Sequence, residues 1–180
     1  MAGSPTQEGI EIRLELPNAR QILEAFEKAP EIVVEELGAA TWEGSLLIQR
    51  EVVERTPRGV GAGGGLAGSI QARDPQIAPG LVRGEVGTAL SYAVPVELGT
   101  RPHFPPIEPL QLWAQHKLGL SEVEAESAAY AIARKIKAHG SQGVHMFAEG
   151  FAATEEQLRT FYARAGERAV ERIGQAGGGQ

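Results

Sequence analysis

The chain has 180 residues, no cysteine and a formal net charge of −6 at neutral pH. This length suits one domain, or one domain with an added segment, and the lack of cysteine excludes disulfides, thiolate metal sites and cysteine nucleophiles. No stretch approaches the roughly 20 apolar residues that cross a bilayer, and the first residues do not resemble a signal peptide. Residues 1–36 hold eight Glu against three bases while the remainder is nearly neutral, which disfavours general binding to nucleic acid.

The two ends of the chain are expected to be disordered, since residues 1–8 are polar and residues 174–180 are rich in glycine. Between them we predict a single α+β domain over residues 9–173. It opens with residues 10–16, which alternate apolar and polar side chains and therefore predict a half-buried strand. The apolar face of this strand consists of Ile10, Ile12, Leu14 and Leu16.

Two helices are predicted next, one on each side of Pro30. The first covers residues 19–28, and the second covers residues 31–55 and begins at the proline, which favours the first turn of a helix. Gly38 and Gly44 lie inside the second helix, where each costs about 1 kcal/mol relative to alanine. We therefore expect another helix to approach this one closely.

A flexible loop and a hairpin follow the long helix. Residues 58–65 hold five glycines, but they follow a helix, precede a predicted strand and lack a Gly-Lys-Ser/Thr step, so they do not match a nucleotide-binding loop. Residues 66–73 and 81–88 predict the two strands of the hairpin. Residues 92–97 are consistent with either a further strand or a single helical turn.

Three helices are predicted in the C-terminal part. Residues 109–118 form the first, and the capping-box pattern Ser121-Glu-Val-Glu124 opens the second. Thr154-Glu-Glu-Gln157 repeats that pattern and predicts that the last helix begins there and ends at Gly174. Together these elements indicate an α+β fold in which a small antiparallel sheet packs against a long helix, with extra C-terminal helices.

The segment between the hairpin and these helices holds the main candidate site. Glu97 lies in an apolar run that ends at Gly99-Thr100, so its carboxylate is expected to be partly buried and to need a donor such as an arginine or loop amides. We interpret Glu97, Gly99 and Thr100 as a structural turn rather than as a catalytic base. A loop stiffened by prolines follows, and this favours an interface. Its candidate interface residues are Arg101, His103 and Phe104.

A catalytic or metal site receives little support from the sequence. No two histidines have the i, i+4 spacing of helical metal ligands, no Gly-x-Ser-x-Gly motif is present, and Asp74 is the only aspartate. We therefore predict a protein that is not an enzyme and needs no cofactor. The histidines are interpreted as exposed loop and capping residues, and Trp42 and Trp113 are predicted to lie in the core.

Residues 134–139, Arg-Lys-Ile-Lys-Ala-His, form the densest basic patch. One interpretation is a solvated helix end, because bases suit the negative end of the helix dipole. The other is an interface with DNA, or with the acidic residues 1–36 of a neighbouring subunit. The candidate interface residues here are Arg134, Lys135 and Lys137.

The order of these features resembles one protein family. A helix ends at Thr56-Pro57, a glycine loop leads to Leu66-Ala-Gly-Ser-Ile70, and a hairpin leads to Tyr92-Ala-Val-Pro-Val-Glu-Leu-Gly-Thr100 and a proline loop. This order is similar to that of the tail-completion proteins of long-tailed bacteriophages, which are minor tail proteins of the head–tail neck. The resemblance covers residues 29–151, and within it residues 105–140 are expected to be a helical insertion.

The resemblance implies a structural virion protein without catalysis. Such proteins join the end of the tail tube to the head connector through a ring, for which six copies are expected. The expected partners are the chain itself and the tail terminator, tail tube and head-connector proteins, with non-specific contact to DNA in the channel as a further option and no membrane. The expected location is the virion and, during assembly, the host cytoplasm.

Three alternatives remain at this stage. One is a tail terminator or tube-like subunit, which belongs to the same structural class. The second is a small metal-dependent hydrolase that uses the histidines. The third is a nucleic-acid-binding adaptor that uses residues 134–139.

Overall fold

The computed structural model describes residues 19–57 and 65–177, and side chains from residue 23 onward within them. The predicted strand at residues 10–16 and nearly all of the glycine loop lie outside these ranges. Among the described helices, none is both long and apolar enough to cross a membrane.

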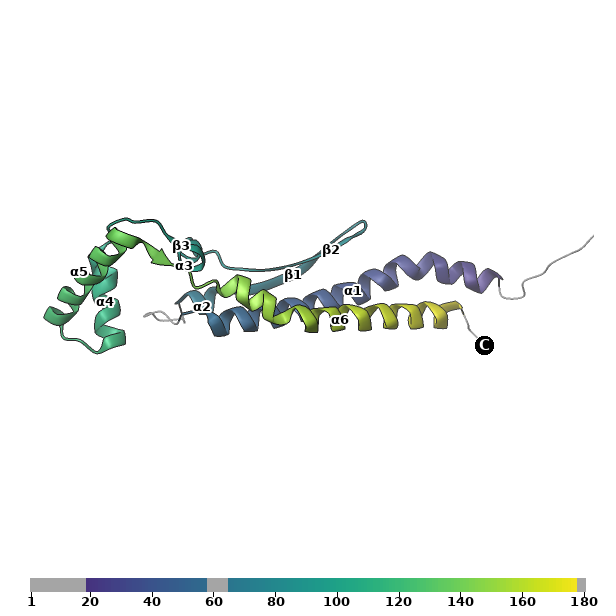
Figure 1. Cartoon of the computed structure of the whole chain (residues 1–180). Coiled ribbons are helices and arrows are strands. Elements are labelled where there is room, and N and C mark those ends of the chain that lie inside the picture. The colour runs from purple at the N-terminus through teal and green to yellow at the C-terminus, as the bar shows by residue number, and fades with distance from the viewer. Residues whose placement is uncertain (1–18, 58–64, 178–180) are drawn as a thin grey trace, which may run out of the picture.

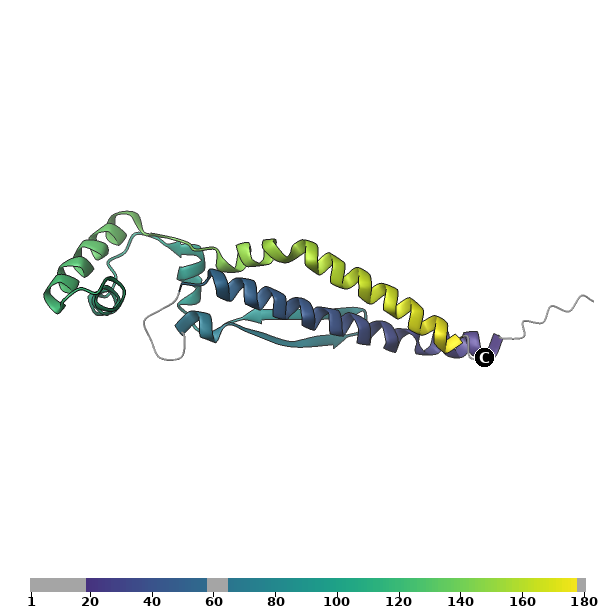
Figure 2. The ribbon, with the colours of Figure 1, turned by 90° about the horizontal axis from the view of Figure 1, so that it is seen from below.

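Two long helices form the axis of an elongated molecule (Figures 1 and 2). α1 (Ala19–Arg55) and α6 (Met146–Gly177) lie side by side and antiparallel. The antiparallel hairpin of β1 (Gln71–Ala78) and β2 (Leu81–Gly87) lies along α1 and follows the short helix α2 (Gly65–Ser69). This arrangement confirms the predicted α+β class, with a small antiparallel sheet against a long helix.

The remaining elements lie at the end of the molecule where α1 ends and α6 begins. α3 (Ala93–Leu98) leads into β3 (Gly99–Thr100), which pairs with β4 (Ser141–Gln142). Between these two strands the chain forms a helical hairpin of α4 (Ile107–Leu118) and α5 (Glu122–His139). In Figure 1 this helical hairpin is at the left, beyond the end of the α1–α6 pair.

α1 is one continuous helix, whereas the sequence predicted two helices that meet at Pro30. Pro30 has no N–H to donate to the carbonyl of Phe26. Both residues are exposed, so water can satisfy that carbonyl and the helix does not have to end. In Figure 1 the purple end of α1 bends away from the line of the rest, as expected for an internal proline.

Two short helices occupy segments that the sequence assigned differently or left open. Residues 66–69 belong to α2 rather than to the predicted strand, and the Ser69 hydroxyl donates to the Leu66 carbonyl at 2.7 Å. Such local bonds from serine to the backbone favour a turn over a strand. Residues 92–97, which the sequence left open, contribute to the helix α3.

The hairpin turn is tighter than predicted. Asp74-Pro75 was expected in the connection but lies within β1, where the pairing register shifts between Arg73 and Gln76. A proline is tolerated at such an irregularity because no ladder hydrogen bond is required of it. The turn itself contains only Pro79-Gly80.

The last helix begins eight residues before the predicted start and continues past its predicted end at Gly174. Thr154, expected to cap the helix, is fully buried inside α6, and its hydroxyl donates to the Phe151 carbonyl at 2.7 Å. By contrast, Ser121 and Glu124 form the predicted capping box at the start of α5. The hydroxyl and N–H of Ser121 hold the pKa of Glu124 below its usual value.

Small side chains allow α1 and α6 to approach closely. A Cβ atom at Gly44 would lie 2.6 Å from Leu158 Cδ2, and one at Gly150 would lie 2.7 Å from Val52 Cγ2. This contact confirms that another helix approaches at Gly44, whereas the neighbour of Gly38 is Ile77 of β1, whose Cδ1 would lie 3.7 Å from an added Cβ. At these two positions only glycine fits against the large side chain opposite, and other large apolar residues of the two helices, such as Leu46 and Phe151, are exposed outside the seam.

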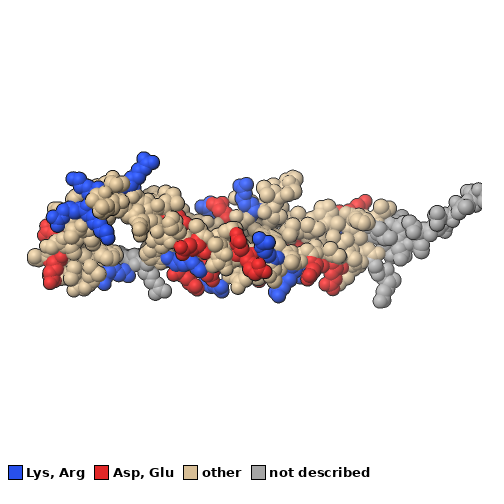
Figure 3. Space-filling model, viewed as in Figure 1, with Lys and Arg blue, Asp and Glu red and all other residues tan. Residues whose placement is uncertain are grey.

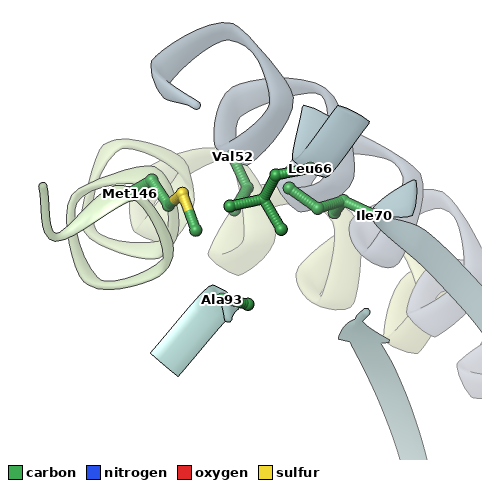
Figure 4. Packing of buried hydrophobic residues seen from close by; sticks show 5 residues of the cluster. All are labelled: Val52, Leu66, Ile70, Ala93 and Met146. Carbon is green, nitrogen blue, oxygen red and sulfur yellow. The ribbon is translucent and has the colours of Figure 1, made fainter. Parts of the chain in front are cut away.

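The main cluster of buried apolar side chains among the described residues lies at the junction of α1, α2, α3 and α6 (Figure 4). Its members are Val52, Leu66, Ile70, Ala93 and Met146. These residues come from distant parts of the chain, so burying them brings the start of the sheet, α3 and the start of α6 to the end of α1. The cluster therefore positions every element that leads to the helical hairpin of α4 and α5.

Charged residues tie the other end of α6 to α1. The Glu36 carboxylate accepts from Arg168 at 2.6 Å and from Arg172 at 2.9 Å, and Arg172 also donates to Glu35 at 2.8 Å. These two arginines, Arg168 first, hold the pKa of Glu36 below its usual value. The Glu36 side chain is only 12% exposed to solvent, so these donors take the place of water in stabilising its ionised form.

Replacing Glu36 by glutamine is expected to lower the melting temperature at pH 7, because the amide accepts less strongly from two guanidinium groups. A carboxyl with a depressed folded pKa stabilises the fold above its unfolded pKa of about 4.3, and this stabilisation is lost as pH falls through the folded value. The difference from wild type should therefore close below about pH 4. Thermal melts from pH 7 to 3 measure this difference in melting temperature, and Glu31→Gln at an exposed position is the control. A difference that stays constant with pH would contradict a stabilising role for the ionised Glu36 carboxylate.

Candidate assembly interface

The helical hairpin is joined to the rest of the molecule by a narrow connection. We call residues 101–139 the head, residues 96–100 and 140–145 the neck, and the remaining described residues the body. In the neck, β3 pairs with β4, and the side-chain oxygens of Thr100 and Ser141 lie 2.9 Å apart. Both chain segments that enter the head therefore pass through one short antiparallel pair.

Two glycines make this pairing possible. Gly99 has φ 78° and ψ −176°, and Gly140 has φ 73° and ψ −163°, a region of backbone space open essentially only to glycine. A Cβ atom at Gly140 would overlap the Thr100 carbonyl oxygen, and one at Gly99 would overlap the Ser141 carbonyl oxygen. The neck thus requires glycine both for backbone conformation and for space.

Glu97 connects the neck to the body by capping α6. Its carboxylate oxygens accept the N–H groups of Phe147 at 3.0 Å and of Ala148 at 3.1 Å, and its carbonyl accepts the N–H of His145 at 3.1 Å. N–H groups in the first turn of a helix have no partner inside the helix, and a negative charge there is also favoured by the helix dipole. The donors expected from the sequence were an arginine or loop amides, and the donors found are amides at the start of a helix.

The head is packed with small residues on the inside. α4 and α5 contact each other, whereas neither makes more than slight contact with the body. The residues of these two helices that are fully buried are all alanines: Ala114, Ala125, Ala129 and Ala133. An alanine seam brings two helices close together but buries little apolar area, so the head has no large core of its own.

Large apolar side chains lie instead on the outside of the head. Trp113, predicted to be in the core, is 39% exposed, whereas Trp42 in α1 is half-buried. Two thin helices cannot bury apolar residues on both faces, which explains the wrong prediction for Trp113. The other exposed large apolar residues of α4 and α5 are Leu112, Leu118, Val123 and Tyr130.

The predicted interface residues of the proline loop are all exposed. Phe104 is half exposed, and Arg101 and His103 lie on the surface beside it. His103 Nδ1 lies 2.9 Å from the Arg101 carbonyl oxygen, so the loop is folded on itself. The structure brings these three residues to the start of the head, where they are accessible to a partner, and their role in an interface stays a prediction.

The head has a positive and a negative end. Arg134, Lys135 and Lys137 are exposed in the last turns of α5, near the neck, and Figure 3 shows basic side chains gathered on the head. The acidic residues of α5 lie in its first turns, at the other end of the helix: Glu122, Glu124 and Glu126. This distribution suits the dipole of α5, and it also gives the head a local basic surface.

The histidines do not form a site in the described part of the chain. His103, His116, His139 and His145 lie on separate segments, and the described residues contain no group of three histidine, aspartate or glutamate side chains that is able to hold a metal ion.

A groove in the body was not anticipated from the sequence. It has a volume of about 880 Å³ and lies between α1, β2 and α6. It is lined by α1 residues, most of them small, such as Thr41 and Gly44, and by residues of β2 and α6, such as Val86 and Phe151. One sequence signal for it is Gly44, which the sequence predicts to admit a neighbouring helix.

No protein-family model, curated protein or solved structure matches the chain.

Substituting Gly140 by alanine should destabilise the neck by more than the same change at Gly119, which also has a positive φ but has nothing within 4 Å of an added Cβ. We expect about 1–2 kcal/mol for Gly119→Ala from backbone strain. Gly140→Ala adds the overlap with the Thr100 carbonyl and should also open the hydrogen bonds of β3 and β4. Hydrogen exchange at Ser141 and Val144 measures this opening, and equal effects of the two variants would refute the close approach.

Replacing Glu97 by alanine removes the cap of α6 and should lower the free energy of unfolding by about 1–2 kcal/mol. Glu97→Gln keeps one carbonyl acceptor and should lower it by less. Urea denaturation measures both variants, and Glu156→Ala, an exposed position on α6, is the control. If Glu97→Ala matches Glu156→Ala, the capping contact contributes nothing.

Proposed function

We propose that this protein is a structural subunit of a phage neck or tail, which joins the end of the tail tube to the head connector as part of a ring. The observation that carries the proposal is the head, which is held away from the body and presents large apolar and basic side chains on its outer surface. Among them, Trp113, Tyr130 and Arg134 are of the residue types most enriched at the hot spots of protein interfaces. A helical pair without a core has no evident purpose in a monomer.

The amount of exposed surface supports assembly. The chain exposes 13264 Å², whereas a compact protein of 19.1 kDa exposes about 8,400 Å². If the residues outside the described ranges exposed as much as an unfolded chain, about 4,300 Å², the remaining 9,000 Å² or so would still exceed the roughly 7,400 Å² expected for its mass. An elongated subunit of this kind is suited to burying surface against neighbours.

The segment that carries the family resemblance supports the same role. Glu97, Gly99 and Thr100 lie at the point where the body, the neck and the last helix meet, and they hold the head in place through backbone hydrogen bonds. Among the described residues of this segment, Glu97 accepts main-chain N–H groups at the start of α6. This is the arrangement expected of a positioning turn in an assembly protein.

The distribution of charge supports contact between unlike surfaces of neighbouring subunits. The basic residues of the head lie at the opposite end of the molecule from the exposed acidic residues Glu24, Glu27 and Glu31 of α1. Contacts between unlike surfaces generate rings when the rotation closes. Glu35 and Glu36 are engaged by arginines of the same chain, so the acidic surface offered to a neighbour is smaller than residues 1–36 suggested.

Deleting residues 101–140, which are the head of this subunit and Gly140, tests the proposal, because Thr100 and Ser141 are paired neighbours that a two-residue Asn-Gly turn can connect. The body should keep its helical circular dichroism, whereas ring formation and binding to the head-proximal ends of tails should be lost. Electron microscopy of protein mixed with tails, together with the measured mass, gives the readout.

A milder pair of variants guards against a folding defect in the shortened chain. Trp113→Ser combined with Tyr130→Ser should weaken assembly at least tenfold, whereas Glu126→Gln, exposed on the same helix as Tyr130, should not change it. A full-length protein that stays monomeric and never associates with phage tails or phage capsids would overturn the structural role. Rings that form equally well without the head would overturn the head as an interface.

A further inference from the structure

The groove of the body has the form of a binding site for an extended segment. One wall is a stripe of α6 residues at helical spacing, in which Phe147, Phe151, Leu158 and Tyr162 are accompanied by the charged Glu155 and Arg159. These positions span about 22 Å along the helix. The opposite wall is β2, and the floor is α1.

β2 has a free edge at this groove. Within the described residues β2 pairs with β1 alone, and the groove is lined by Gly84 and Val86 of β2 but by no residue of β1. The edge of β2 that is not bonded to β1 therefore borders the groove. Unpaired N–H and C=O groups on an edge strand are a template for pairing with another strand.

We infer that residues 10–16 of a second copy of this chain bind in the groove as a strand that pairs with the free edge of β2. This inference rests on the proposed ring assembly and names the contact that links one subunit to the next. The bound strand places its apolar face on the floor and on the α6 wall. Its polar face is directed to solvent.

The sequence of residues 10–16 fits the groove in length and pattern. Four apolar side chains alternate with polar ones over seven residues, which span about 20 Å as a strand. This matches the length of the α6 wall, and the period of two places all four apolar side chains on one face.

The polar residues of the segment fit the outer face of the hairpin. Glu11, Arg13 and Glu15 alternate in sign, as do Arg83 and Glu85 on β2, where Glu85 already accepts from Arg73 of β1 at 2.8 Å. Opposite charges on neighbouring strands stabilise a sheet modestly. An added strand thus extends a row of mixed charges rather than creating repulsion.

The segment of the same chain does not reach the groove. The α1 residues of the floor begin at Thr41, 22 positions after Ala19, which is about 33 Å along the helix. Leu14 and Leu16 lie five and three residues before Ala19 and reach at most about 18 Å and 11 Å from it. Residues 10–16 of the same chain therefore cannot lie along the groove. The occupant therefore comes from another copy.

The absence of cysteine allows a direct test in the full-length protein. We would prepare Leu14→Cys and, separately, Phe151→Cys and Leu158→Cys, which sample two registers along the groove. Mixing a Leu14→Cys preparation with either groove variant and oxidising it should form a disulfide between copies, which requires Cα atoms within about 7 Å. The product would be a species of twice the 19.1 kDa chain mass under denaturing, non-reducing conditions.

The matched control is Arg13→Cys, which lies on the opposite face of the same predicted strand. It should give at least tenfold less cross-linked product with either groove variant. In a chain that carries both Leu14→Cys and Leu158→Cys, a disulfide within one chain would overturn the inference, because the segment would then occupy its own groove.

Mass measurement without oxidation separates this inference from the proposed function. Rings that form normally but give no cross-link at either groove position would overturn the strand contact. They would leave the proposed structural role in the phage neck or tail in place. A monomer without cross-links would overturn both. Cross-links between copies that Arg13→Cys does not give would support both.

Discussion

The close antiparallel contact between α1 and α6 is the constraint on which the rest of the structure depends. It is close because Gly44 and Gly150 lie on the seam, where any larger side chain would meet Leu158 or Val52. Large α6 residues beside the seam, such as Phe151, line a groove. The same contact brings the start of α6 to the end of α1, where the main buried cluster forms and the neck begins.

The backbone conformation of the neck sets the position of the head relative to the body. Gly99 and Gly140 permit the close pairing of β3 with β4, which larger residues would block. Glu97 holds the start of α6 against the segment that leads into β3. These interactions use main-chain groups almost entirely. As a result, the outer surfaces of α4 and α5 are free to vary and to meet a partner without affecting how the body folds.

The body and the head each leave surface uncovered, but of different kinds. The body has a small core and a groove bordered by an open sheet edge, and the head has an alanine seam with large side chains outside it. Both features leave apolar surface and backbone groups that a neighbouring chain is suited to cover. The proposed ring assembly and the proposed strand contact are two consequences of the same shortage of internal packing.

The sequence by itself determined the α+β class, the presence of a hairpin, α4 and α5, because local patterns such as the capping box at Ser121 act over a few positions. It placed the first hairpin strand too early and Asp74-Pro75 in the connection, because the register shift within β1 depends on pairing with β2. It also indicated that Glu97 needs donors. Only the tertiary structure decided where α6 begins, since its cap is Glu97, fifty residues earlier in the chain. The continuity of α1 through Pro30, the exposure of Trp113 and the groove were likewise decided by which surfaces meet, and no local pattern records that.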